Sequence, residues 1–206
     1  MSHQRRDMSG IFYSTQTLPS NYQSSWCLDM RERKNLIFAN LIALLVLIIV
    51  TPLVFLFTSS VRTDQTYSLP LTGLSGLADI IVLVLALALM LLVHEGIHGI
   101  CIWIFTGSAP KFALKVYYAY AAAPGWYFSK WPYFFTAIAP LIVISALGLL
   151  AIALVPIKWV FTLMLVVIFN ASGAVGDAWV AAALLTRNRS LLAQDDGDKV
   201  TFFEAA

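Results

Sequence analysis

Residues 79–105, DIIVLVLALALMLLVHEGIHGICIWIF, decide the fold of this chain. A helix of about 20 apolar residues crosses the roughly 30 Å of hydrocarbon in a bilayer, and this stretch is long enough to do so. After its first residue it carries no charged or ionisable side chain until HEGIH, residues 94–98. Charged groups inside a membrane helix cost about 2.5–3.5 kcal/mol each on insertion scales. The polar residues in this helix therefore need an explanation in function or in packing.

The composition of the whole chain is that of a membrane protein. Of its 206 residues, 60% are hydrophobic and 12% are charged, whereas soluble domains contain about 45–50% apolar and about 25% charged residues. The formal net charge of +2 is too small to indicate a nucleic-acid partner. The first partner of this chain is thus the lipid bilayer.

Four apolar runs are long enough to span the membrane as helices. They lie at about residues 35–58, 79–105, 133–155 and 159–185. Strands do not fit, because a membrane-spanning sheet must close into a barrel of short alternating segments. The sequence therefore predicts an all-α membrane protein with a four-helix domain over residues 35–186.

Basic residues predict the orientation of the four helices. Of the 13 lysines and arginines, 11 lie before the first span, between the second and third spans, or after the fourth. The other two connections hold only Arg62 and Lys158. Since the basic side of a membrane protein faces the cytoplasm, the N-terminal segment 1–34 and the tail 187–206 are predicted to be cytoplasmic. We expect a multi-pass protein of a bacterial or archaeal cell membrane.

Two connecting loops have patterns of their own. Residues 59–78 include SLPLTGLSGL, which fits either a re-entrant segment or an ordinary surface loop. Residues 111–118 alternate in part between apolar and polar side chains, and AAAPGW at 121–126 is typical of a turn. We expect a short β-strand or hairpin in this cytoplasmic loop between the second and third helices. The alternative is an aromatic belt at the membrane interface.

The polar residues His94-Glu95-Gly96-Ile97-His98 have the spacing HExxH. On a helix, residues four apart lie about 40° apart in rotation and one turn apart in height, so both imidazoles can reach one ion. Zinc suits two neutral imidazoles and a carboxylate with one position left for water, and Glu95 stands where it can serve as the general base. The alternative is a polar patch that packs helices together through hydrogen bonds.

A catalytic zinc ion usually takes three protein ligands, so a third is needed. Asp177 is the only acidic residue inside another span. Counted from the outer ends of their helices, Asp177 and the two histidines lie at similar depth, roughly 25–27 Å along at 1.5 Å per residue. Asp79 is about 22 Å from His94 on the same helix and cannot reach an ion bound by the two histidines. The alternative for Asp177 is a lone acid that pairs with a lysine or extends to the interface.

Asn170 lies two turns from Asp177 on nearly the same helix face, about 10 Å away. It is too far away to share the ion, but it could bind a substrate backbone or an oxyanion. A hydrogen bond between helices is the alternative. The acids of the tail lie beyond the last span and can approach only if the tail folds back. They are Asp195, Asp196, Asp198 and Glu204.

Four segments of the chain together resemble a known family. They are HEGIH at 94–98, PGWYFSK at 124–130, IAPLIV at 138–143 and N-x-x-G-x-x-G-D at 170–177. In these segments the chain is similar to the family called putative zincin membrane peptidases, which is itself similar to the site-2 intramembrane metalloproteases. The resemblance covers about residues 70–200.

The resemblance implies that His94, His98 and Asp177 hold Zn²⁺ and that Glu95 is the catalytic base. The chain is then expected to be an intramembrane zinc metalloprotease that hydrolyses peptide bonds of membrane-associated proteins near the cytoplasmic face. It departs from the site-2 proteases at Ala178, where those enzymes usually have glycine. Two other functions stay open, namely zinc transport or sensing with the same ligands, and a catalytically inactive scaffold.

Overall fold

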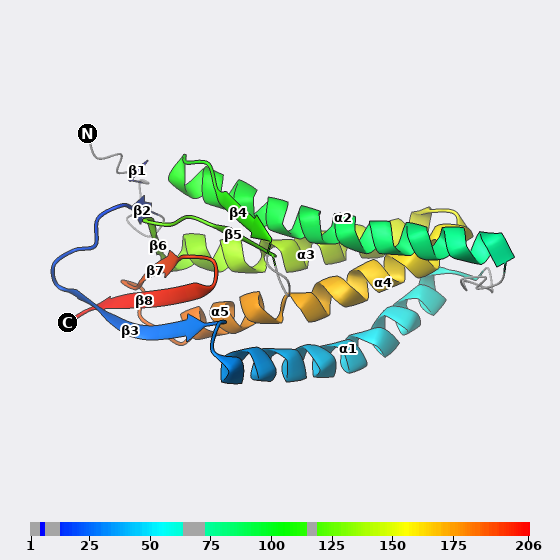
Figure 1. Cartoon of the computed structure of the whole chain (residues 1–206), viewed down its shortest axis with the longest axis horizontal. Coiled ribbons are helices and arrows are strands. Elements are labelled where there is room, and N and C mark those ends of the chain that lie inside the picture. The colour runs from blue at the N-terminus through cyan, green and yellow to red at the C-terminus, as the bar shows by residue number, and fades with distance from the viewer. Residues whose placement is uncertain (1–4, 7–12, 64–72, 115–118) are drawn as a thin grey trace. The chain divides into compact units, whose positions relative to one another are not determined.

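Helices make up most of the chain, as the apolar runs predict. The computed structural model describes residues 5–6, 13–63, 73–114 and 119–206, and its elements are labelled in Figure 1. The helices are α1 (Arg33–Val61), α2 (Gly73–Thr106), α3 (Lys130–Leu154), α4 (Ile157–Gly173) and α5 (Val175–Leu185). The first three begin and end within six residues of the first three predicted spans. The predicted re-entrant segment or loop at 59–78 lies mostly outside the described residues.

The fourth predicted span is broken. Helices α4 and α5 are bent by 46° at Ala174, whose N–H still donates to the carbonyl of Asn170. Gly173 and Gly176 flank the break, and glycine is a poor helix former because it loses the most backbone entropy. Three described helices are therefore long and apolar enough to cross a membrane, or four if the bent pair counts as one span.

The chain divides into two compact units, of which one contains residues 41–94 and 141–175. Its core lies between α1, α3 and α4, where Ile152, Val160 and Met164 are fully buried. Outside this core, many large apolar side chains of α1, α2 and α3 are exposed. An exposed apolar surface of this extent is unusual in soluble proteins and is compatible with contact to lipid.

A six-stranded antiparallel sheet belongs to the other unit, which contains residues 1–40, 95–140 and 176–206. The strand order is β1-β2-β6-β7-β8-β3. The strands are β1 (Arg5–Arg6), β2 (Tyr13–Thr15), β6 (Tyr127–Ser129), β7 (Leu192–Asp195), β8 (Lys199–Ala205) and β3 (Tyr22–Asp29). The segment before α1, the loop before α3 and the tail after α5 thus all contribute strands (Figure 1). The prediction of an all-α fold missed this sheet.

One face of this sheet packs against parts of α2, α3 and α5. Phe128 and Phe202 of the sheet are fully buried there, with Ile102 of α2 and Leu184 of α5. Burial of such a side chain stabilises the fold by about 1.5–3 kcal/mol. This apolar core therefore fixes the C-terminal part of α2, the start of α3 and α5 within one unit.

The strand predicted in the loop between the second and third helices is found in part. β4 (Lys111–Leu114) pairs with β5 (Ala119–Ala122) in a separate two-stranded antiparallel sheet. Residues 115–118 of the prediction lie outside the described residues. The AAAPGW segment turns at Gly125, whose φ of 78° is a left-handed conformation that glycine adopts without strain.

Candidate metal centre

Helix α2 presents two buried histidines one turn apart. His94 is 7% exposed and His98 is 8% exposed. The helix is continuous from Gly73 to Thr106, so the position of one imidazole relative to the other follows from the helix itself. The spacing inferred from the sequence therefore does place both imidazoles on one side of α2.

Each imidazole is held through its Nδ1 atom. Nδ1 of His98 lies 2.8 Å from the backbone carbonyl oxygen of Thr136 on α3, and a carbonyl oxygen only accepts, so this Nδ1 carries a proton. Nδ1 of His94 lies 3.1 Å from Oδ1 of Asn170. A neutral imidazole with a proton on Nδ1 keeps its lone pair on Nε2. Metal-binding histidines usually have this arrangement.

The orientation of Asn170 follows from its other contacts. The side chain is 1% exposed, and its Nδ2 lies 3.3 Å from the hydroxyl oxygen of Ser145 and 3.5 Å from the carbonyl oxygen of Leu141. Because a carbonyl accepts, the NH₂ group faces α3 and Oδ1 faces His94. Asn170 thus orients His94. Its predicted contact with a substrate stays a prediction.

Asp177 comes from the first turn of α5. Its Oδ2 lies 3.5 Å from Nε2 of His98. This distance is long for a hydrogen bond, but it is close to the separation of about 3.4 Å between two ligands of a tetrahedral ion with bonds of 2.0–2.1 Å. The ligand atoms of His94, His98 and Asp177 all lie within 4.8 Å of one another. These residues form a group that could hold a metal ion, and two imidazoles with one carboxylate suit zinc.

Glu95 lies between the two histidines on α2. Its Oε2 atom is buried, and its charge is within electrostatic range of His98. A general base must lie within hydrogen-bonding reach of the proton that it removes, directly or through one water molecule. Glu95 therefore stays the predicted base.

Two partners of the group carried no signal in the sequence. Thr136 acts through its backbone carbonyl, which every residue has. Ser145 is one of many small polar residues in the apolar helices, and such residues are common there for packing alone. Their roles depend on how α3 packs, which the sequence does not reveal by itself.

The sequence around this group matches a family. A family model with the description "Putative zincin peptidase" matches residues 87–192, just over half of the chain. The chain belongs to this family. The region shared with the zincin peptidases contains all three residues of the candidate metal group as well as Glu95, and the family implies zinc as the metal. The comparisons with curated proteins and with solved structures gave no match.

Proposed function

We propose that this zincin-family chain is an intramembrane zinc metalloprotease, which hydrolyses peptide bonds of membrane-associated proteins near the cytoplasmic face. The observation that carries the proposal is the 3.5 Å between Nε2 of His98 and Oδ2 of Asp177. A charge-assisted hydrogen bond that only joined two helices would close to about 2.7–2.9 Å. A separation that matches two ligands of one ion supports a metal site instead.

The residues of the chain have separate tasks in this reaction. His94, His98 and Asp177 would hold zinc, which when bound supplies a Lewis acid for the peptide carbonyl and lowers the pKa of water. Glu95 accepts a proton from water at its carboxylate and donates a proton to the nitrogen of the leaving amine. The hydrogen bonds at the two Nδ1 atoms keep both imidazoles in the tautomer with a lone pair on Nε2.

The sheet supports the cytoplasmic placement. Segments from before α1, between α2 and α3 and after α5 pair with one another, and paired strands must lie on the same side of a membrane. Together with the first residues of α1 and α3 (Arg33, Lys34 and Lys130), the same three segments carry 11 of the 13 basic residues. An even number of crossings, with α4 and α5 together as one span, satisfies both observations.

β4 offers a way to hold an unwound substrate. A peptide bond in a helix is shielded by its own hydrogen bonds, so the substrate must unwind and its backbone groups then need partners. β4 and β5 form a two-stranded sheet, to which a substrate strand can be added. β4 also packs against α2 close to His98, because a Cβ at Gly99 would lie 2.5 Å from the ring of Phe112.

The test measures metal and cleavage separately. Full-length protein purified in detergent should contain zinc by elemental analysis, as should Glu95→Gln, whereas His94→Ala and Asp177→Ala should lose it. In proteoliposomes that hold single-span membrane proteins, Glu95→Gln should lose cleavage. Asp79→Asn is the matched control, because it removes an acid of α2 outside the metal group, and it should keep both zinc and cleavage.

Each other outcome has a clear meaning. Cleavage by Glu95→Gln at the wild-type rate would refute the role of this residue as the base. Metal flux through proteoliposomes without cleavage would favour transport or sensing. A wild type without zinc would favour the inactive scaffold.

A further inference from the structure

The C-terminal tail folds back onto the start of α3. β7 ends at Asp195, whose carboxylate accepts two hydrogen bonds. The hydroxyl of Tyr133 donates to Oδ2 at 2.8 Å, and the backbone N–H of Gly197 donates to Oδ1 at 2.7 Å. Tyr133 lies in the first turn of α3 and is 4% exposed. Both donors are neutral, so these hydrogen bonds bring no positive charge to the carboxylate.

Asp195 is within electrostatic range of the metal group. The pKa of Asp195 is raised from 3.8 to about 6, mainly by burial. The hydrogen bonds from Gly197 and Tyr133 and the charge of His98 act to lower this pKa, and the charge of Asp177 acts to raise it. The ionised carboxylate is thus unfavourable where it lies. Carboxylates that a fold keeps in such surroundings are often functional.

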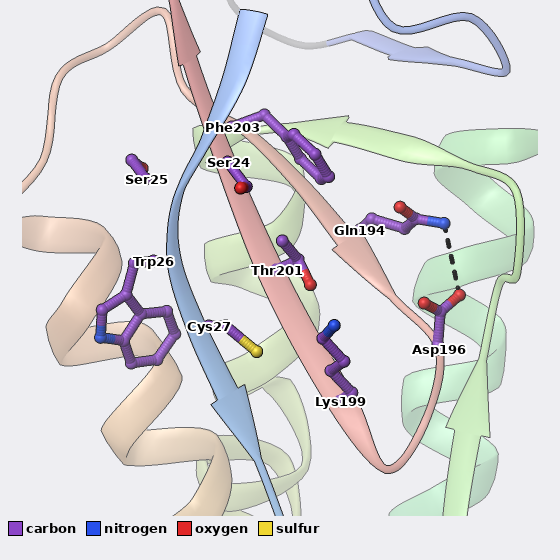
Figure 2. Close-up of a pocket in the computed structure, with 9 residues that line it drawn as sticks. All are labelled: Ser24, Ser25, Trp26, Cys27, Gln194, Asp196, Lys199, Thr201 and Phe203. Atoms are coloured by element: carbon purple, nitrogen blue, oxygen red, sulfur yellow. Dashed lines mark hydrogen bonds between the residues drawn. The ribbon is translucent and has the colours of Figure 1, made fainter.

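The alternation along β7 separates Asp195 from its neighbours. Successive side chains of a strand point to opposite faces of a sheet. Gln194 and Asp196 line a hollow on one face of the sheet, where Nε2 of Gln194 donates to Oδ1 of Asp196 at 3.3 Å (Figure 2). Asp195 instead reaches Tyr133 on α3. Two successive acids therefore have different surroundings, and one is a matched control for the other.

Tyr133 links Asp195 to His98 through α3. Tyr133 and Thr136 are three residues apart, so they lie on the same face of the helix. The carbonyl oxygen of Thr136 holds Nδ1 of His98 at 2.8 Å. The contact of Asp195 with Tyr133 therefore lies one turn of α3 from the carbonyl that orients this imidazole.

We propose that Asp195 is a positioning residue of the metal centre. Its negative charge favours a cation in the group of three ligands, and its hydrogen bond with Tyr133 holds the start of α3, whose next turn orients His98. The proposal rests on the metal site of the proposed function, but it does not depend on proteolysis. The hairpin of β7 and β8 is then part of the metal centre. By reciprocity, a bound metal ion stabilises the seating of this hairpin.

The test compares the Co²⁺ affinity of full-length variants in detergent, by competition with a chelator. Asp195→Asn keeps the shape of the side chain and removes its charge. We expect it to bind Co²⁺ about tenfold more weakly, at the lower end of the range for outer partners of metal ligands. The visible absorption band of bound Co²⁺ should also change, because it reports the geometry around the ion. Asp195→Glu should recover most of the affinity.

The matched control is Asp196→Asn. It removes the same charge from the same turn, but from a residue of the hollow, where water and salt screen the charge. Its Co²⁺ affinity should stay within about twofold of the wild type. Equal losses in Asp195→Asn and Asp196→Asn, or an unchanged absorption band in Asp195→Asn, would overturn the proposal.

Tyr133→Phe tests the link through α3. It should weaken Co²⁺ binding less than Asp195→Asn does, because the charge remains. Adding Tyr133→Phe to Asp195→Ala should weaken binding no further than Asp195→Ala alone, since two residues that act through one contact are not additive. A loss of Co²⁺ affinity in this double variant that equals the product of the two single losses would refute the link between Asp195 and Tyr133. A wild type that binds Co²⁺ but cleaves nothing would contradict the protease and leave this proposal standing, whereas a wild type that binds no Co²⁺ would overturn both.

Discussion

Replacing Asp195 by asparagine should stabilise the metal-free protein at neutral pH. Burial raises the pKa of Asp195 in the folded state from 3.8 to about 6. Between these two values the folded state binds the proton more tightly than the unfolded state, so the free energy of unfolding falls as the pH rises through this window. Above the folded-state pKa, ionisation of Asp195 lowers the free energy of unfolding by about 3 kcal/mol, because a difference of one unit in pKa corresponds to about 1.4 kcal/mol. This is an upper limit, because the residue is only partly buried.

The assay is thermal unfolding in detergent with a chelator, at pH 5 and at pH 8. About half of the penalty, roughly 1.5 kcal/mol, develops between these two pH values. The Tm advantage of Asp195→Asn over the wild type should therefore be larger at pH 8 than at pH 5, by up to about 3–6 °C. Effects of lost hydrogen bonds are present at both pH values and cancel in this comparison. With saturating zinc at pH 8, the wild type should have the higher Tm, because its ionised carboxylate then favours the bound cation.

Asp196→Asn is again the control, and its Tm relative to the wild type should differ little between the two pH values. A Tm difference between Asp195→Asn and the wild type that is the same at pH 5 and pH 8 would refute the raised pKa of Asp195. Such a result would mean that water reaches the Asp195 carboxylate freely in the folded protein.

Three further substitutions test contacts around the site. Asn170→Leu should weaken metal binding by about 10–100-fold in a chelator competition, because His94 loses the partner of its Nδ1. Lys130→Met should lower the free energy of unfolding by about 1–3 kcal/mol in thermal unfolding, because the buried ammonium group donates to backbone carbonyls at and just after the end of α5. Gly99→Ala adds a methyl group where the ring of Phe112 lies. This methyl group should displace β4, which is proposed to hold the substrate, so cleavage should fall while zinc content stays unchanged.

Hydropathy predicts the helices of this chain well, because a long apolar run leaves few other structures for the backbone. The break between α4 and α5 escapes the same reasoning. The segment GAVG at 173–176 contains no proline and no charge, so its hydropathy continues that of the span. Two glycines weaken the helix there, but whether a weakened helix bends depends on what it packs against. Asp177 lies in the first helical turn after this break.

The sheet is hidden from the sequence for a different reason. In the sequence, β3 precedes and β8 follows all five described helices. The two strands nevertheless pair with each other, with Tyr22 opposite Ala205. Strands of two to eight residues carry little periodicity, and pairing over such a separation leaves no local trace. The tail alone has a local signal: Asp196-Gly197, with φ of 89° at the glycine, precedes the alternating run KVTFF. An Asp-Gly pair beside an alternating run is typical of a hairpin.

The contacts of His98 and Asp177 bear on the two interpretations of HExxH, a metal site and a packing contact between helices. Because Thr136 fixes the proton of His98 on Nδ1, a neutral His98 faces the Asp177 carboxylate with a lone pair on Nε2, and two acceptors at 3.5 Å repel each other. A proton on either group, or a metal ion between them, would offset that repulsion. A proton would draw the nitrogen and the oxygen together to about 2.7–2.9 Å. A metal ion with bonds of 2.0–2.1 Å holds them about 3.4 Å apart. The observed distance therefore favours the metal over a packing contact between helices.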